Sequence, residues 1–133
     1  MTPPRLVLIL ESDPNAMAQM RRVLAGMGIR ALAAAEEEAL RDTVAMLLSA
    51  KTPPALIIAR VALPSGSGIR MLEDTAAVFP DAQQMLISHY PRKLLSSVPG
   101  FLEHAAHFLK AEFTDDQFRA AVDRALARGA VAG

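Results

Sequence analysis

Charged and hydroxyl side chains follow four short apolar runs of this sequence, each at the point where a run ends. If the runs are strands of a parallel sheet, these side chains meet at one edge, where ligands and chemistry are commonly found. Two cations and a hydroxyl at such an edge could hold a carboxylate or phosphate group. The side chains are Glu11, Ser12 and Asp13 after the first run, Arg60 after the second, Ser88 after the third and Lys110 after the fourth.

Arg60 is the most informative of these residues, because a small acid at the end of its run could react and Arg60 cannot. A guanidinium stays protonated and has no lone pair with which to attack phosphorus. It also cannot coordinate Mg²⁺, whose ligands are hard oxygen atoms, usually those of carboxylates. The long cation therefore argues against a phosphorylated or metal-binding strand end.

The elements that would position these residues alternate between apolar runs and helical periodicities. We expect strands at residues 6–10, 29–33, 55–59, 85–87 and 106–109, and a helix after each of them. Asp13 before Pro14 is a typical N-cap, and Thr114 with Gln117 forms a capping box for the last helix. Five strand–helix units predict an α/β fold, a doubly wound parallel sheet with helices on both faces.

The ends and apolar faces of the helices are also predicted. Gly28 and Gly129 should follow the first and last helices, and Pro80 should end the third. A short fourth helix is expected at residues 91–98. The second helix opens on three glutamates, Phe113 can pack on Phe118, and the apolar stripe of the second helix is Leu40, Val44, Leu47 and Leu48.

The composition limits the class of protein. A chain of 133 residues, 52% hydrophobic and 5% aromatic, predicts one domain with an aliphatic core, spanning about residues 5–128 before a short C-terminal tail or linker stub. The formal net charge is zero, so no global field favours nucleic acid or a membrane surface. We expect a cytoplasmic protein that does not bind nucleic acid or a membrane directly. The three histidines lack a metal-site spacing and no Gly-x-Ser-x-Gly elbow is present, so we expect no metal, no cofactor and no enzymatic activity.

From about Arg5 to Arg128 the sequence resembles the receiver domain of two-component response regulators. The resemblance implies a flavodoxin-like (βα)5 fold with strand order 2-1-3-4-5. It also implies a phosphorylation site, in which two acids hold a divalent cation, an aspartate ending the third strand accepts the phosphoryl group, and a hydroxyl and a lysine bind its oxygens. The motifs that carry it, in order, are Leu8-Ile9-Leu10-Glu11-Ser12-Asp13-Pro14, Leu63-Pro64-Ser65-Gly66-Ser67-Gly68, Ser88, and Phe108-Leu109-Lys110 with Phe113.

The sequence departs from the family pattern at two positions. Glu11 matches one acid of the pair, and Ser88 and Lys110 match the hydroxyl and the lysine. Ser12 stands at the second acid, and Arg60, four residues before Pro64, stands at the aspartate. The resemblance thus implies a degenerate receiver that keeps the fold and has lost phosphorylation. His107 occupies the position of the family's switch aromatic.

The charge of Arg60 requires a partner. Glu11 is its natural counter-charge, with Asp13 as a second, and we expect a bidentate Glu11–Arg60 ion pair with Lys110 across the same crevice. Alternatively, the side chain of Arg60 extends along the apolar surface to reach water. Neither arrangement supplies a nucleophile.

Three functions remain open. The first is a phosphorylation-independent signalling module that binds a protein partner or output domain, or forms a homodimer. Its surface would be the face of helix four, strand five and helix five, with Arg92, Lys93, Leu94, Leu95, Phe101, His107 and Arg119. The second is a small-molecule or anion sensor using the crevice at Arg60, Ser88 and Lys110. The third is a receiver phosphorylated at another acceptor. The chain could also be the N-terminal regulatory domain of a longer transcriptional regulator.

Overall fold

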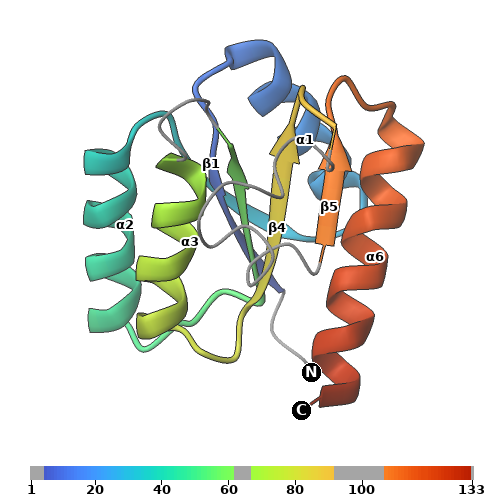
Figure 1. Ribbon diagram of the computed structural model, residues 1–133. Coiled ribbons are helices and arrows are strands. Elements are labelled where there is room, and N and C mark those ends of the chain that lie inside the picture. Colours follow the sequence, from blue (N-terminus) through green and yellow to red (C-terminus); the bar gives the residue numbers. More distant parts are fainter. Residues whose placement is uncertain (1–4, 62–66, 92–106, 133) are drawn as a thin grey trace.

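The computed structural model describes residues 5–61, 67–91 and 107–132, in which strands and helices alternate (Figure 1). The strands are β1 (Leu6–Leu10), β2 (Arg30–Ala34), β3 (Leu56–Arg60), β4 (Gln83–Ser88) and β5 (His107–Lys110). The helices are α1 (Pro14–Gly26), α2 (Glu37–Ser49), α3 (Ser67–Val78) and α6 (Asp115–Ala132). Among these residues, no helix combines the length and the apolar character needed to cross a membrane.

The strands form one parallel sheet in the order β2-β1-β3-β4-β5. This confirms the predicted doubly wound α/β fold and its strand order, with the Ala-rich β2 at one edge. The chain winds outward from β1 to β2 and then returns past β1 to β3. The carboxyl ends of β1 and β3 therefore flank the topological switch point, where open α/β sheets commonly bind ligands.

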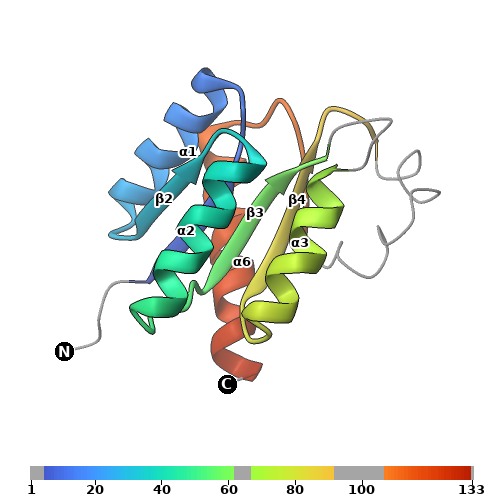
Figure 2. The same cartoon turned by 90° about the vertical axis from the view of Figure 1, so that its left-hand side faces the viewer.

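Helices cover both faces of the sheet: α1 and α6 lie on one face, and α2 and α3 lie on the other (Figures 1 and 2). Alternate residues of each strand point to opposite layers, so that Leu8 packs with α2 and α3 while Val7 and Ile9 pack with α1 and α6. Both faces are buried, which explains why β1 and β3 are unbroken apolar runs.

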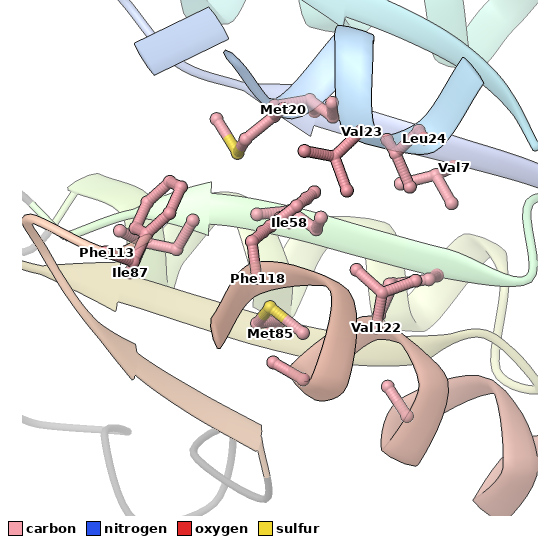
Figure 3. Packing of buried hydrophobic residues seen from close by; sticks show 14 of the residues in the cluster. Val7, Met20, Val23, Leu24, Ile58, Met85, Ile87, Phe113, Phe118 and Val122 are labelled. Atoms are coloured by element: carbon pink, nitrogen blue, oxygen red, sulfur yellow. The ribbon is translucent and has the colours of Figure 1, made fainter. Parts of the chain in front are cut away.

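The layer between the sheet and the α1–α6 pair is shown in Figure 3. Aliphatic and methionine side chains fill most of it, as the low aromatic content predicts. The Phe113 and Phe118 rings stack within it, with centroids 5.4 Å apart, which confirms the contact expected before the last helix. The labelled side chains are Val7, Met20, Val23, Leu24, Ile58, Met85, Ile87, Phe113, Phe118 and Val122.

Local sequence signals set most helix ends. The Asp13 carboxylate accepts from the Asn15 amide and caps α1, and Gly28 follows the helix with φ +73°, a conformation that glycine adopts without strain. The Thr114 amide donates to the Gln117 side chain, and the Gln117 amide donates to the Thr114 hydroxyl. This reciprocal pair is the predicted capping box at the start of α6.

Some details differ from the expectations. Leu48 is 49% exposed, because it lies about 100° around the helix from the buried Leu47 and so leaves the contact stripe of α2. Gly129 does not end the last helix: it keeps helical backbone, and α6 continues to Ala132. Strands β2, β3 and β5 each begin one residue later than predicted, and β4 begins two residues earlier. The helix expected at residues 91–98 lies almost wholly outside the described residues.

Candidate functional site

The side chains singled out by the sequence lie at one edge of the sheet. Glu11 directly follows β1, and Arg60, Ser88 and Lys110 are the last residues of β3, β4 and β5. Because the strands are parallel, all four carboxyl ends face the same edge. Ser88 pairs in register with Lys110, and Arg60 pairs with the residue before Ser88.

Glu11 and Arg60 form the ion pair that the sequence predicts. Arg60 Nε lies 2.6 Å from Oε1 and 2.8 Å from Oε2 of Glu11, and Arg60 Nη2 lies 2.5 Å from Oε1. The Glu11 side chain is 1% exposed and that of Arg60 is 18% exposed. The pair is therefore largely removed from water, and the guanidinium does not extend freely into solvent.

The hydrogen bonds of Glu11 leave its carboxylate little capacity for another ligand. Both oxygens accept from Arg60, and Oε2 also accepts from the Asp13 amide at 3.2 Å. Asp13, the alternative counter-charge, caps α1 and forms no ion pair with Arg60. Ser12 is exposed and lines a cavity with Glu11 and Arg60. Among the described residues, no group of three or more His, Cys, Asp and Glu side chains could hold a metal ion.

Ser88 stabilises a turn at the end of β4. Its side chain is fully buried, and its hydroxyl accepts a hydrogen bond from the Tyr90 amide at 3.0 Å. Its carbonyl accepts from the Ala111 amide at 2.7 Å, which ties the ends of β4 and β5 together. The hydroxyl is thus used within the loop that it begins.

The described residues form one cavity that is lined by Lys110 and others that are lined by Arg60, so the expected crevice of Arg60, Ser88 and Lys110 stays a prediction. Lys110 is exposed and lines a cavity of about 470 Å³ between β5 and α6. Separating the two cations avoids a like-charge contact, since Glu11 already pairs with Arg60. Arg60 lines two cavities. One has a volume of about 350 Å³ and is lined by Asp13, Asn15, Ala16, Gln19, Arg60, His89, Ala111, Glu112 and Phe113. The other has a volume of about 250 Å³ and is lined by Leu10, Glu11, Ser12, Ala35, Glu36, Glu37 and Arg60.

Gly68 positions Arg60, a role that the sequence did not reveal. A Cβ atom at Gly68 would lie 2.1 Å from the Arg60 carbonyl oxygen, far inside van der Waals contact. The first turn of α3 can therefore approach the end of β3 only because residue 68 is glycine. In the sequence, Gly68 is only the last residue of the Leu63–Gly68 motif, because the close approach depends on the tertiary packing of α3 on β3.

His107 lies at the start of β5, where its ring nitrogen Nε2 is 3.0 Å from the Gln83 side-chain oxygen on β4. Its pKa lies below the ordinary value of 6.5, first because the ring is partly buried and then because Arg128 and Arg124 bring positive charge near it. The ring is therefore neutral near pH 7. Gln83, its partner, has no signal in the sequence because the contact joins two strands.

The expected interaction face is only partly described. Five of its members, Arg92, Lys93, Leu94, Leu95 and Phe101, lie outside the described residues. Arg119 lines a cavity with Arg5 and the end of α1, on the flank of α6 opposite Arg124 and Arg128. Arg119 therefore lies on another flank of α6 than Arg124 and Arg128, and the face as a whole stays a prediction.

Comparison with solved structures identifies the fold. A CheY-like receiver domain protein from Methanospirillum hungatei superposes with a TM-score of 0.81 at 16% identity, covering 98% of this chain and 100% of that one. A response regulator from Thermotoga maritima gives 0.76 at 15% identity, covering 94% and 99%. The chain has the receiver-domain fold.

A third match is the receiver domain of PhyR from Erythrobacter litoralis, with a TM-score of 0.70 at 24% identity, covering 93% of this chain and 91% of that one. No protein-family model and no curated protein matches the sequence. The likeness is therefore one of backbone architecture, at 15–24% sequence identity.

Proposed function

We propose that the chain is an atypical receiver domain that acts in signalling as a protein-interaction module without phosphorylation. The observation that carries this proposal is the Glu11–Arg60 ion pair at the switch point. At these positions the receiver pattern would have a metal-binding acid and a phosphoryl acceptor. Arg60 has no lone pair to accept a phosphoryl group, and it uses both oxygens of the remaining acid.

Ser88 and Lys110, which match the hydroxyl and the lysine of the receiver's phosphorylation site, support the same proposal. The Ser88 hydroxyl is held by the Tyr90 amide, and Lys110 lines a different cavity from Arg60. The hydroxyl and the lysine that would bind a phosphoryl group in the receiver pattern are thus used separately here. Catalysis needs reacting groups held together in one geometry, so this arrangement also favours a role without enzymatic activity.

The partner would be a protein or an output domain, or a second copy of the chain, bound through the face of helix four, β5 and α6. Of this surface, β5 and α6 belong to the described residues. The zero net charge disfavours direct binding to nucleic acid or membrane, and is compatible with a cytoplasmic protein.

The direct test is incubation with acetyl phosphate and Mg²⁺, followed by intact-mass measurement. We expect no mass gain and no tight binding of beryllofluoride. The variant Ser12→Asp/Arg60→Asp, which restores both missing carboxylates, is the matched control. A gain of one phosphoryl group by the unmodified chain would reveal another acceptor and contradict the proposal.

A second candidate function is a small-molecule or anion sensor at Arg60. It is favoured by the adjoining 350 Å³ cavity and by Arg60 Nη1, which is buried and has no hydrogen-bond acceptor among the described residues. Against it, Glu11 already neutralises Arg60, and Asp13 and Glu112 bring negative charge to the cavity. A thermal-shift screen of anionic metabolites tests it, and the absence of stabilisation by any of them would exclude it.

A third candidate is the N-terminal regulatory domain of a longer transcriptional regulator. The receiver fold supports it only in general terms, because such a fold serves as a module joined to an output domain. Determining whether the reading frame continues beyond Gly133 decides this question.

A further inference from the structure

Lys110 and Arg124 line the same cavity between β5 and α6, which lie side by side (Figure 1). Both side chains are exposed, and neither forms an ion pair within the described part of the chain. The cavity has a volume of about 470 Å³, and Leu109, Ala111, Glu112, Gln117 and Ala120 complete its lining. Two cations therefore converge on a space that is large enough for one or two side chains.

The charges of α6 are segregated around the helix. The acid at its start, Asp115, is bound by Arg22 and Gln19 of α1. Asp123 lies on the flank towards Arg5 and Arg119. The flank towards β5 carries Arg124 and Arg128, whose charges reach His107. Positive charge thus gathers beside β5, away from Asp115 and Asp123. The remaining acid of α6, Asp116, is exposed in the first turn and does not line the cavity.

Gln117 adds a neutral donor to this cavity. Its side-chain oxygen accepts from the Thr114 amide in the capping box, which fixes the position of its amide group. The Nε2 atom remains as a donor with no partner among the described residues. Lys110, Arg124 and Gln117 together provide charged and neutral donors, and Glu112 is the one acid in the lining.

We propose that this cavity binds a carboxylate side chain from an acidic segment of a protein partner. The inference rests on the proposed function, because the occupant belongs to the partner of the interaction module, and it specifies the chemistry of that partner. Carboxylates are the natural ligands of a lysine, an arginine and an amide donor. A nucleic acid fits less well, because it needs a row of cations and this cavity has two, with Glu112 beside them.

The experiment is a titration of the ¹⁵N-labelled chain with an acetylated and amidated hexaglutamate peptide, followed by NMR. We expect saturable shifts centred on the amides of Lys110, Gln117 and Arg124, which fade as salt is raised because exposed charges are screened. Lys110→Gln and Arg124→Gln should each weaken binding roughly twofold to fivefold, the range for exposed ion pairs. The double variant should bind more weakly than either single variant.

The matched control is Arg41→Gln, which removes an exposed arginine from α2 on the opposite face of the sheet and should leave the affinity unchanged. The spectrum of each variant reports its folding directly. Absent shifts, or affinity unchanged in the double variant, would overturn the inference. If a hexathymidylate oligonucleotide bound at these residues more tightly than hexaglutamate, the inference would also be overturned, and the partner would be a nucleic acid. A mass gain with acetyl phosphate contradicts the proposed function instead, so the two failures are distinguishable.

Discussion

Removing the negative charge of Glu11 should destabilise the fold strongly. In Glu11→Gln the Arg60 guanidinium stays in a site where the partner side chain was 1% exposed and its own is 18% exposed. Leaving one charge of a buried pair unpaired costs roughly 3–5 kcal/mol. Arg60 retains some access to water, so we expect the lower end, about 3 kcal/mol. For a chain of this length that corresponds to a midpoint lowered by roughly 10–15 °C.

The measurement is urea unfolding of both proteins, followed by far-ultraviolet circular dichroism because the chain has no tryptophan. The double variant Glu11→Gln/Arg60→Met removes both charges and should lose less stability than Glu11→Gln alone, since no charge remains unpaired. Asp115→Asn breaks the exposed ion pair with Arg22 and should have only a small effect. A loss below about 1 kcal/mol in Glu11→Gln would refute the reasoning, because that is the value of a solvent-screened pair.

Three further predictions concern single positions. Gly68→Ala should cost roughly 1–3 kcal/mol, because its Cβ would force α3 away from the Arg60 carbonyl, and the urea midpoint measures this loss. Thr114→Ala should cost about 1 kcal/mol by removing the capping box, and Thr114→Ser should restore most of it. Folding lowers the pKa of His107, so stability should be full above 6.5 and fall as the pH drops through that value, because the unfolded chain binds the proton more tightly. His107→Asn should flatten this fall when urea midpoints are compared at about pH 7.5 and 5.5, and an unchanged profile would exclude His107 as its origin.

Short-range signals account for most of the fold that could be predicted. The apolar run of β1, the Asp13 cap and the Thr114–Gln117 box each act within a few residues, and all of them appear in the structure. The predictions for Leu48 and Gly129 were wrong because they treated long-range packing as if it were a short-range signal. Whether a leucine on a helix is covered, and whether a glycine ends the helix, depends on what packs beside it.

In the candidate site, too, some features could be predicted from the sequence and others depended on tertiary packing. The charges of Glu11 and Arg60 and their places after β1 and β3 predicted their ion pair, because adjacent parallel strands bring their carboxyl ends together. The position of Lys110 could not be predicted in this way. Its strand end lies at the expected edge, but its long side chain lines the β5–α6 cavity with Arg124.

The sequence by itself determined the order of the elements, the strand-end residues and the absence of a nucleophile at Arg60, because these depend on residue type and local spacing. Only the tertiary structure decided which charged side chains lie next to one another. Packing brings Glu11 within 2.6 Å of Arg60 across β1 and β3, places Gly68 against the Arg60 carbonyl and makes Lys110 line a cavity with Arg124. These arrangements join residues far apart in the chain, and their free energy depends on burial, which local sequence does not encode.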